Sequence, residues 1–277
     1  MTVVQSQFAP HVALLVAQEC GFLGDVKLEI RQAASSSVQL AGFLDGSLDV
    51  AISAIDNLFI WIPSGANVSL FGQAESITPL ELFVDPSLKS LQQLEDRPFA
   101  VDAFENGFAL IARSLFQQLN VAPNFVETGG VGERLQALSS GCVSGTLLGP
   151  PFSQVAEQQG FRSLASLRDF MPDYPGQGII VRNESYVKDE VRQFLHGLER
   201  AVDYSNSLLQ PEGIQILLNA GLTSSVAEIW DARPKTFRVD PSSLDSVQIL
   251  RQSLGLLPSD FNIHEYSEYT KRKVDLA

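Results

Sequence analysis

Several polar side chains stand directly after apolar segments, where a strand is expected to end and a helix to begin. In the first quarter of the chain they are His11, Ser36, Ser37, Asp56 and Asn57. Imidazole, hydroxyl, carboxylate and amide groups bind small polar molecules through hydrogen bonds, and an imidazole can also transfer protons. We therefore predict that these residues contribute to a ligand-binding site.

Two of these side chains also have an ordinary structural role open to them. His11 follows Pro10 at the start of a predicted helix and could simply cap that helix, so ligand contact is favoured only slightly. Asp56 follows an apolar strand and could act as an N-cap carboxylate, which is a common role for aspartate. Both alternatives stay open at the level of the sequence.

A second group of candidates lies between residues 102 and 152. The members that follow apolar segments or bound a turn are Asp102, Phe104, Glu105, Asn106, Gly129, Gly130, Gly149 and Phe152. The glycine pair could bring backbone N–H groups close to an anionic group, or it could form an ordinary tight turn. The two phenylalanines could form aromatic walls, although each alone is more typical of a core.

Few cations accompany these candidates. Arg134, about one turn into a predicted helix, is the nearest. A site for a dianion normally contains an arginine or lysine clamp. The ligand is therefore expected to be neutral, cationic, or a monoanion held by helix N-termini.

An enzymatic function would have to use the same residues. Of the three histidines, only His11 is placed to act as an acid or base, together with Asp102 or Glu105. The sequence contains no nucleophile elbow, no P-loop and no paired metal-ligand spacing. No cofactor and no metal are predicted.

Alternating strands and helices must position these loops. Strands are expected at 3–7, 26–32, 49–54, 68–73, 80–84, 98–102, 125–128, 143–148 and 178–182. Helices are expected at 10–21, from Ser35 to before Gly46, and at 55–62, 107–119, 132–140, 188–208, 212–219, 224–231 and 242–254, with another after the Gly149-Pro150-Pro151 turn that runs to about Gln159. This order predicts mostly parallel sheets with helices on both faces, and a ligand outside the carboxyl ends of the strands.

Composition limits the class of protein and its partners. The chain has 277 residues, 45% of them hydrophobic, and a net charge of -13, which disfavours nucleic acid and anionic membrane surfaces as partners. No apolar run reaches the roughly 18 residues of a transmembrane helix, so membrane insertion is not expected. Cys20 and Cys142 are expected to be free thiols.

Six segments together resemble a known family. Residues 11–23 (HVALLVAQECGFL) and 44–51 (LDGSLDVA) are similar to the first helix and to a signature of the substrate-binding proteins for nitrate, sulfonate, taurine and thiamine-pyrimidine precursors. The other four are 88–94 (LKSLQQL), 149–151 (GPP), 160–164 (GFRSL) and 191–201 (VRQFLHGLERA). Each motif is loose alone, but their order along the chain is specific. Two features depart from the family pattern: Ser144-Gly145 stands where many members have an aspartate-alanine pair, and Met1–Gln5 shows no export signal.

The resemblance implies a type II periplasmic-binding-protein fold, α/β in class, with two mixed, mostly parallel sheets flanked by helices. One lobe would comprise residues 1–83 plus 179–277 and the other residues 84–178, with a small organic molecule bound in the interdomain cleft. Such a protein would deliver its ligand to an ABC transporter permease. The alternative is a cytosolic enzyme on the same fold, of lyase, decarboxylase or isomerase type, using His11 with a cleft carboxylate. As written, the sequence is expected to be cytoplasmic; if an export signal was removed, it is periplasmic or extracellular.

Overall fold

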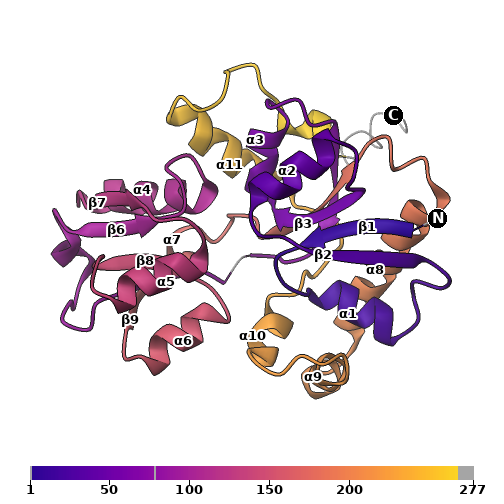
Figure 1. Cartoon of the computed structure of the whole chain (residues 1–277), viewed down its shortest axis with the longest axis horizontal. Coiled ribbons are helices and arrows are strands. Elements are labelled where there is room, and N and C mark those ends of the chain that lie inside the picture. Colours follow the sequence, from indigo (N-terminus) through magenta and orange to yellow (C-terminus); the bar gives the residue numbers. More distant parts are fainter. Residues whose placement is uncertain (1, 78, 268–277) are drawn as a thin grey trace. The chain divides into compact units, whose positions relative to one another are not determined.

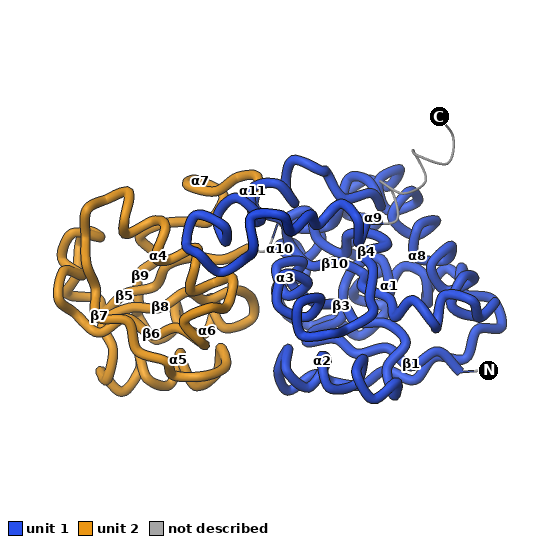
Figure 2. Tube along the Cα trace, turned by 90° about the horizontal axis from the view of Figure 1, so that it is seen from above, with its two compact units in different colours: residues 1–77, 174–277 blue, residues 78–173 orange. Residues whose placement is uncertain are grey.

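The chain folds into two compact units (Figure 2). The computed structural model describes residues 2–77 and 79–267. Unit 1 comprises residues 1–77 and 174–277, and unit 2 comprises residues 78–173. The sequence placed the two boundaries after residues 83 and 178 instead. They fall earlier because the strand at 81–84 pairs within the sheet of unit 2, and the strand that begins at residue 177 pairs within the sheet of unit 1.

Unit 1 is built on a five-stranded mixed sheet. Its strands lie in the order β2-β1-β3-β10-β4, with bounds β1 Thr2–Gln7, β2 Lys27–Gln32, β3 Val50–Ala54, β4 Val68–Gln73 and β10 Gln177–Arg182. Strand β1 pairs in parallel with β2 and β3, whereas β10 runs antiparallel to β3 and β4. The carboxyl ends of β1, β2 and β3 therefore share one edge of the sheet.

Helices cover both faces of this sheet (Figure 1). Helices α1 (Val12–Glu19) and α8 (Asp189–Ser207) pack together on one face, and α2 (Ser36–Leu44) and α3 (Leu58–Trp61) lie on the other. Residues 12–17 of α1 are all buried, because the helix is packed between the sheet and α8. The chain continues through α9 (Gln210–Asn219), α10 (Val226–Asp231) and α11 (Pro241–Ser253).

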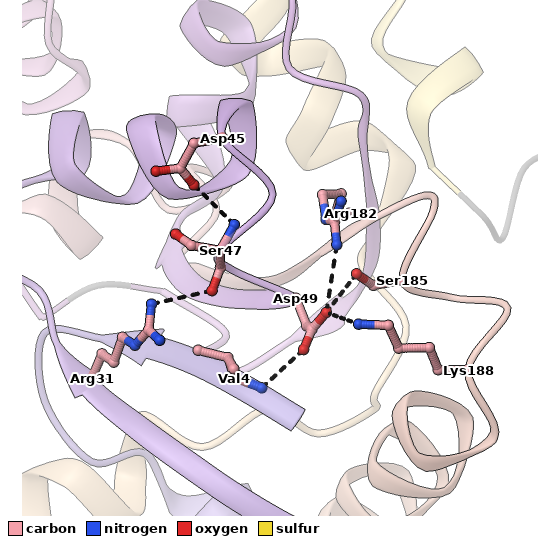
Figure 3. Close-up of polar contacts among 8 residues, drawn as sticks. All are labelled: Val4, Arg31, Asp45, Ser47, Asp49, Arg182, Ser185 and Lys188. Atoms are coloured by element: carbon pink, nitrogen blue, oxygen red, sulfur yellow. Dashed lines mark hydrogen bonds and ion pairs between the residues drawn. The ribbon is translucent and has the colours of Figure 1, made fainter. Parts of the chain in front are cut away.

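At the amino-terminal end of β3, a buried carboxylate joins β1 and the segment between β10 and α8 (Figure 3). One oxygen of Asp49 accepts hydrogen bonds from Ser185 Oγ and Lys188 Nζ, both at 2.6 Å, and the other accepts from the backbone N–H of Val4 at 3.0 Å. Burial opposes ionisation of Asp49, but the hydrogen bonds from Lys188 and Ser185 outweigh it and lower the pKa of the carboxyl group. Asp49, the second aspartate of the 44–51 motif, therefore has a structural role.

Unit 2 repeats the architecture with a second five-stranded mixed sheet. The order is β7-β6-β8-β5-β9, with bounds β5 Glu81–Val84, β6 Pro98–Val101, β7 Asn124–Glu127, β8 Gly145–Leu148 and β9 Arg162–Ser166. Strand β6 is parallel to β7 and β8, and β5 is antiparallel to β8 and β9. Each sheet, over the described residues, thus has two parallel and two antiparallel pairings, because one strand in each runs against its neighbours.

Alternate residues of β6 face two different helix layers. Phe99 contacts Phe116 of α4 (Gly107–Leu119), with ring centroids 5.2 Å apart. Ala100, the next residue, joins the core formed with α5 (Val131–Ser139) and α6 (Phe152–Gln158). Helix α7 (Leu167–Phe170) and the 3-10 turns η1 (Ile55–Asn57), η2 (Leu91–Leu94) and η3 (Ile263–Tyr266) complete the described elements.

Most predicted strands and helices are confirmed, and one strand and one α-helix were missed. Strand β9 escaped prediction because its sequence, RSLAS, is short, partly polar and lies at the sheet edge next to a register shift. Helix α7 follows it immediately. Cys20 and Cys142 are free, as expected. Within the part of the chain that the structure describes, no helix is both long and apolar enough to cross a membrane.

Candidate functional site

His11 lies at the carboxyl-terminal side of β1, at the N-cap of α1. Its side chain does not cap the helix, and neither ring nitrogen has a hydrogen-bond partner among the described residues. The residue is only 3% exposed, and this burial lowers the pKa of the imidazole to about 3. His11 is therefore a neutral imidazole near pH 7, able to accept or donate one hydrogen bond to a ligand.

Buried glutamines of unit 1 also have oxygens without partners among the described residues, and they were not singled out from the sequence. Gln5 Nε2 donates to Gln7 Oε1 at 2.7 Å, while Gln39 Nε2 of α2 donates to the backbone oxygen of Ile52 at 3.2 Å. The side-chain oxygens of Gln5 and Gln39 are buried and have no partner within the described residues. A buried glutamine within a strand is unusual, and this feature of the sequence could have identified Gln5.

Asp56 is held by an arginine from far along the chain. Its two carboxylate oxygens accept from Arg251 of α11, Oδ1 from Nε at 2.8 Å and Oδ2 from Nη2 at 2.5 Å. Both residues are 2% exposed. A carboxylate already engaged in this bidentate pair is a structural link between η1 and α11, so we withdraw Asp56 from the ligand-binding candidates.

The remaining candidates of unit 1 differ in their exposure. Asn57 is buried and donates to Ser53 Oγ at 2.8 Å. Ser35 is the residue that caps α2, accepting from the N–H of Val38 at 3.3 Å. Ser36 and Ser37 occupy the first turn of that helix, Ser36 half-buried and Ser37 exposed. Their hydroxyl groups remain candidates for ligand contact.

In unit 2, the loop after β6 is organised by carboxylates. The amide of Asn106 donates to Asp102 Oδ2, and its Oδ1 accepts from the N–H of Gly107, the first residue of α4. The backbone N–H of Phe104 donates to Glu127 Oε1 at 2.7 Å. The side chains of Phe104 and Glu105 are exposed. Asp102 and Asn106 thus lie together at the carboxyl end of β6.

The glycine pair before α5 does receive an anionic group, but the group belongs to the chain. Glu133 Oε2 accepts a hydrogen bond from the backbone N–H of Gly130. A Cβ atom at Gly129 or at Gly130 would lie 2.9 Å from the same carboxylate oxygen. Gly129 and Gly130 therefore form the N-terminal cap of α5, and the Gly130 N–H is not available to a ligand.

Arg134, on the same helix, is buried at 4% exposure. The buried Nε of its guanidinium has no hydrogen-bond partner among the described residues. Burial lowers the pKa of Arg134, and the charges of Asp102 and Glu133 oppose that shift. The sequence identified this residue as the nearest cation but gave it no role.

The last candidates lie at the start of α6. A Cβ atom at Gly149 would lie 3.1 Å from the backbone oxygen of Pro79, so this glycine permits a close approach of two backbone segments. The ring of Phe152 is 3.7 Å from the position that a Cβ of Gly132 would occupy. Phe152 is therefore near the first turn of α5, and Gly149 is explained by packing.

Each unit thus contains its own candidate residues. Those of unit 1 are His11, Gln5, Gln39 and the α2 serines, and those of unit 2 are Asp102, Asn106, Phe152 and Arg134. His11 and Asn106 lie at the N-caps of helices that follow strands, whereas Gln5 lies within β1 and Gln39 within α2. Among the described residues, no group of three histidine, cysteine, aspartate or glutamate side chains could hold a metal ion.

Each of the two sheets contains one strand that runs antiparallel to its neighbours, and each is flanked by helices. This arrangement defines the type II periplasmic-binding-protein fold. The model of the NMT1/THI5-like family matches residues 9–212. The chain belongs to this family. A search of curated proteins gave no significant match to the chain.

Solved structures of low sequence identity share the fold. The ligand-binding component of an ABC-type import system from Staphylococcus aureus, with zinc bound, superposes with a TM-score of 0.77 at 16% identity and covers 93% of both chains. The alkanesulfonate-binding protein SsuA from Xanthomonas axonopodis pv. citri, bound to MOPS, gives 0.75 at 16% identity and covers 96% of this chain and 97% of its own. The CA3427 gene product of Candida albicans gives 0.76 at 14% identity, with coverage of 99% and 95%.

Proposed function

We propose that this protein binds one small organic molecule and acts as the substrate-binding component of an ABC importer. The observation that carries the proposal is a set of buried polar groups that have no hydrogen-bond partner among the described residues. In unit 1 these are both ring nitrogens of His11 and the side-chain oxygens of Gln5 and Gln39; in unit 2 it is the Nε of Arg134. Each such group lowers the free energy of unfolding by roughly 1–3 kcal/mol unless another molecule supplies the missing hydrogen bond.

A ligand offers the simplest compensation for these costs. Its own polar atoms would complete the missing hydrogen bonds, so binding would stabilise groups that folding alone leaves unsatisfied. The neutral acceptors of Gln5 and Gln39 fit donor groups of a ligand, whereas the guanidinium of Arg134 fits an acceptor.

The transport role rests on the family and on the neighbours. Two of the similar structures are a component of an import system and an alkanesulfonate-binding protein. A protein with this role would meet an ABC transporter permease outside the cytoplasmic membrane, in the periplasm or the extracellular space. The fold of this family allows a protein to capture a ligand and release it again.

The enzymatic alternative is weakened by the state of His11. A base whose conjugate acid has a pKa of about 3 is too weak to remove a proton efficiently near pH 7. Among the described residues, no carboxylate orients its ring, although catalytic histidines are usually held by such a partner. These properties fit ligand contact better than acid–base catalysis.

Native mass spectrometry of freshly purified protein tests the proposal. We expect a species heavier than the bare chain, whose extra mass leaves as an intact small molecule after denaturation. Adding that molecule back should raise the melting temperature in proportion to the logarithm of its concentration. If no compound co-purifies and none from a metabolite panel stabilises the protein, the binding function is wrong.

The same ligand separates binding from catalysis. Incubation with the wild-type protein should return the compound unchanged. A conversion that is lost in His11→Asn but kept in His196→Asn, whose side chain is 76% exposed, would establish the enzyme instead.

A further inference from the structure

The two edges of the unit 1 sheet differ in what covers them. At one edge, a later segment of the chain covers β4: Leu70 forms a bridge with Ser267, and the N–H of Gln73 donates to the backbone oxygen of Phe237 at 2.9 Å. At the other edge, β2 pairs with β1 alone among the described strands. The backbone N–H and C=O groups on the outer side of β2 therefore have no strand partner within residues 2–77 and 79–267.

The side chains of β2 are also accessible. Ile30 is 43% exposed, and the side chains of Arg31 and Glu29 are 45% and 51% exposed. Leu28 is half-buried and packs against the core of unit 1. An open edge strand that carries apolar side chains is a template on which another strand can pair.

The charges along this edge alternate in sign. Asp25, in the turn before β2, is negative, Lys27 positive, Glu29 negative and Arg31 positive, so this stretch is neutral in a chain of net charge -13. In reverse order, the four signs are positive, negative, positive and negative. A second copy that runs antiparallel therefore presents the opposite charge at every position, which favours a copy of this chain as the partner.

We propose that two copies of this chain associate through their β2 edges, which pair antiparallel and join the two unit 1 sheets into one. The twofold axis passes between the two Leu28 residues. The opposing pairs across the axis are Lys27 with Glu29, Val26 with Ile30, and Leu28 with Leu28, and Asp25 comes near Arg31. The proposal goes beyond the binding of a ligand and does not depend on it.

The charges also fix the register of the pairing. If the axis lay at Lys27, two lysines would be opposed, and Asp25 would face Glu29. If it lay at Glu29, two glutamates would be opposed, and Lys27 would face Arg31. Like charges directly opposite each other destabilise an antiparallel pair. The axis at Leu28 avoids both arrangements and also places apolar side chains opposite each other.

Arg31 can contribute to this interface without losing its present contacts. Its Nε lies 2.7 Å from Glu29 Oε1, and its Nη1 donates to the backbone oxygen of Ser47 at 3.1 Å (Figure 3). A guanidinium has five N–H donors, so others remain for Asp25 of the second copy.

Sedimentation equilibrium of the full chain gives the first test. We expect a reversible equilibrium between one chain and two, with no larger species, because pairing uses up the β2 edge of both copies. A protein that stays monomeric up to about 0.5 mM would overturn the proposal. Continued growth beyond two chains would also overturn it.

Charge reversal gives the second test. Lys27→Glu places a carboxylate opposite Glu29 of the second copy, twice in each dimer, and should raise the dissociation constant at least about tenfold. Lys27→Glu/Glu29→Lys restores opposite charges and the wild-type net charge, so its dissociation constant should return to within about threefold of the wild-type value.

Lys235→Glu is the matched control. Lys235 is exposed and precedes Thr236, whose backbone oxygen accepts from Gln73 of β4 at the other edge of the sheet. The variant has the same change in net charge as Lys27→Glu and should dimerise like the wild type. Equal dissociation constants for all these proteins, or no recovery in the double variant, would show a dimer formed by another surface and overturn the proposal.

Disulfide cross-linking tests the register, in a Cys142→Ser background because Cys142 is exposed. Lys27→Cys and Glu29→Cys proteins, when mixed under mild oxidation, should form linked heterodimers, since opposing Cα atoms are about 4.5–5.5 Å apart. Neither protein alone should cross-link, because residues of the same number are roughly 7–8 Å apart. No cross-link in the mixture, or one in either protein alone, would overturn the pairing about Leu28.

Discussion

The free energy of unfolding depends on how single carboxylates of unit 1 are paired. The carboxylate of Asp56 forms a buried ion pair with the guanidinium of Arg251. Glu75, just after β4, has one oxygen hydrogen-bonded to Gln177 Nε2 at 3.0 Å and another without a partner among the described residues. Burial raises the pKa of Glu75 to about 7, while the hydrogen bonds from Gln177 oppose this shift. Removing the charge of Asp56 is therefore expected to lower the free energy of unfolding, whereas removing the charge of Glu75 is expected to raise it at pH 8.

Asp56→Asn should destabilise the protein by about 3 kcal/mol, because it leaves the Arg251 guanidinium buried without a counter-charge. Urea denaturation monitored by circular dichroism measures the free energy of unfolding. The double variant Asp56→Asn/Arg251→Met should recover part of the loss, since it removes both charges. A single variant as stable as the wild type would contradict the importance of this pair.

Glu75→Gln should change how stability depends on pH. Since the pKa of Glu75 is raised from 4.5 to about 7 on folding, the folded state binds more protons between these values, and the wild type loses stability as pH rises through that window. Between pH 5 and pH 8 the loss should be roughly 2–3 kcal/mol. Glutamine can keep the hydrogen bond from Gln177 without a charge, so the variant should be the more stable protein at pH 8 and should lack this part of the pH dependence. Unfolding free energies at pH 5 and pH 8 give the check; identical slopes for both proteins would refute it.

At the scale of elements, close packing of helices depends on single glycines. A Cβ atom at Gly213 of α9 would lie 2.0 Å from Cη2 of Trp230 in α10, and Trp230 is 1% exposed. The indole can occupy this position only because residue 213 has no side chain. Helices α9 and α10 are thus fixed against each other by this contact.

Gly213→Ala should therefore destabilise the protein by about 2 kcal/mol, since the indole must move out of a close-packed site. Gly132→Ala is the matched control, because its added methyl group meets nothing nearer than Phe152 at 3.7 Å and should change stability by less than about 0.5 kcal/mol. Thermal unfolding followed by tryptophan fluorescence distinguishes the two. Equal melting temperatures would show that the indole shifts at no cost.

At the scale of the whole molecule, the chain forms its two units differently. Unit 2 is one continuous segment, whereas unit 1 combines both ends of the chain. Unit 2 also has its own sheet and buried cores on both faces of that sheet. It therefore contains what an independently folding domain needs.

A fragment of residues 79–173 should fold alone. We expect a helix and strand content matching unit 2 by circular dichroism, a cooperative melting transition, and dispersed amide resonances by NMR. Residues 2–77 alone should not fold, because they lack β10, which lies between β3 and β4 in the sheet. A disordered 79–173 fragment would show that unit 2 depends on unit 1.

Much of the fold could be predicted because its signals are local. Helix α4 begins and ends at the predicted residues, 107 and 119, since its apolar spacing and the preceding Asn106 cap are contained in one segment. The alternation of strands and helices, the family motifs and the position of the polar loops follow from the same short-range patterns. Strand β9 was missed because an edge strand needs little apolar sequence.

The sequence by itself determined the fold class, the family and the loops that hold most of the candidate residues. Only the tertiary structure decided which of those side chains already have partners. Asp56 is engaged by Arg251, 195 residues away, and the Gly130 N–H by Glu133, whereas within the described residues the ring nitrogens of His11 and the Nε of Arg134 are buried without hydrogen-bond partners. The physical reason is that helix and strand formation depends on neighbouring residues, while the pairing of buried polar groups depends on contacts between distant segments.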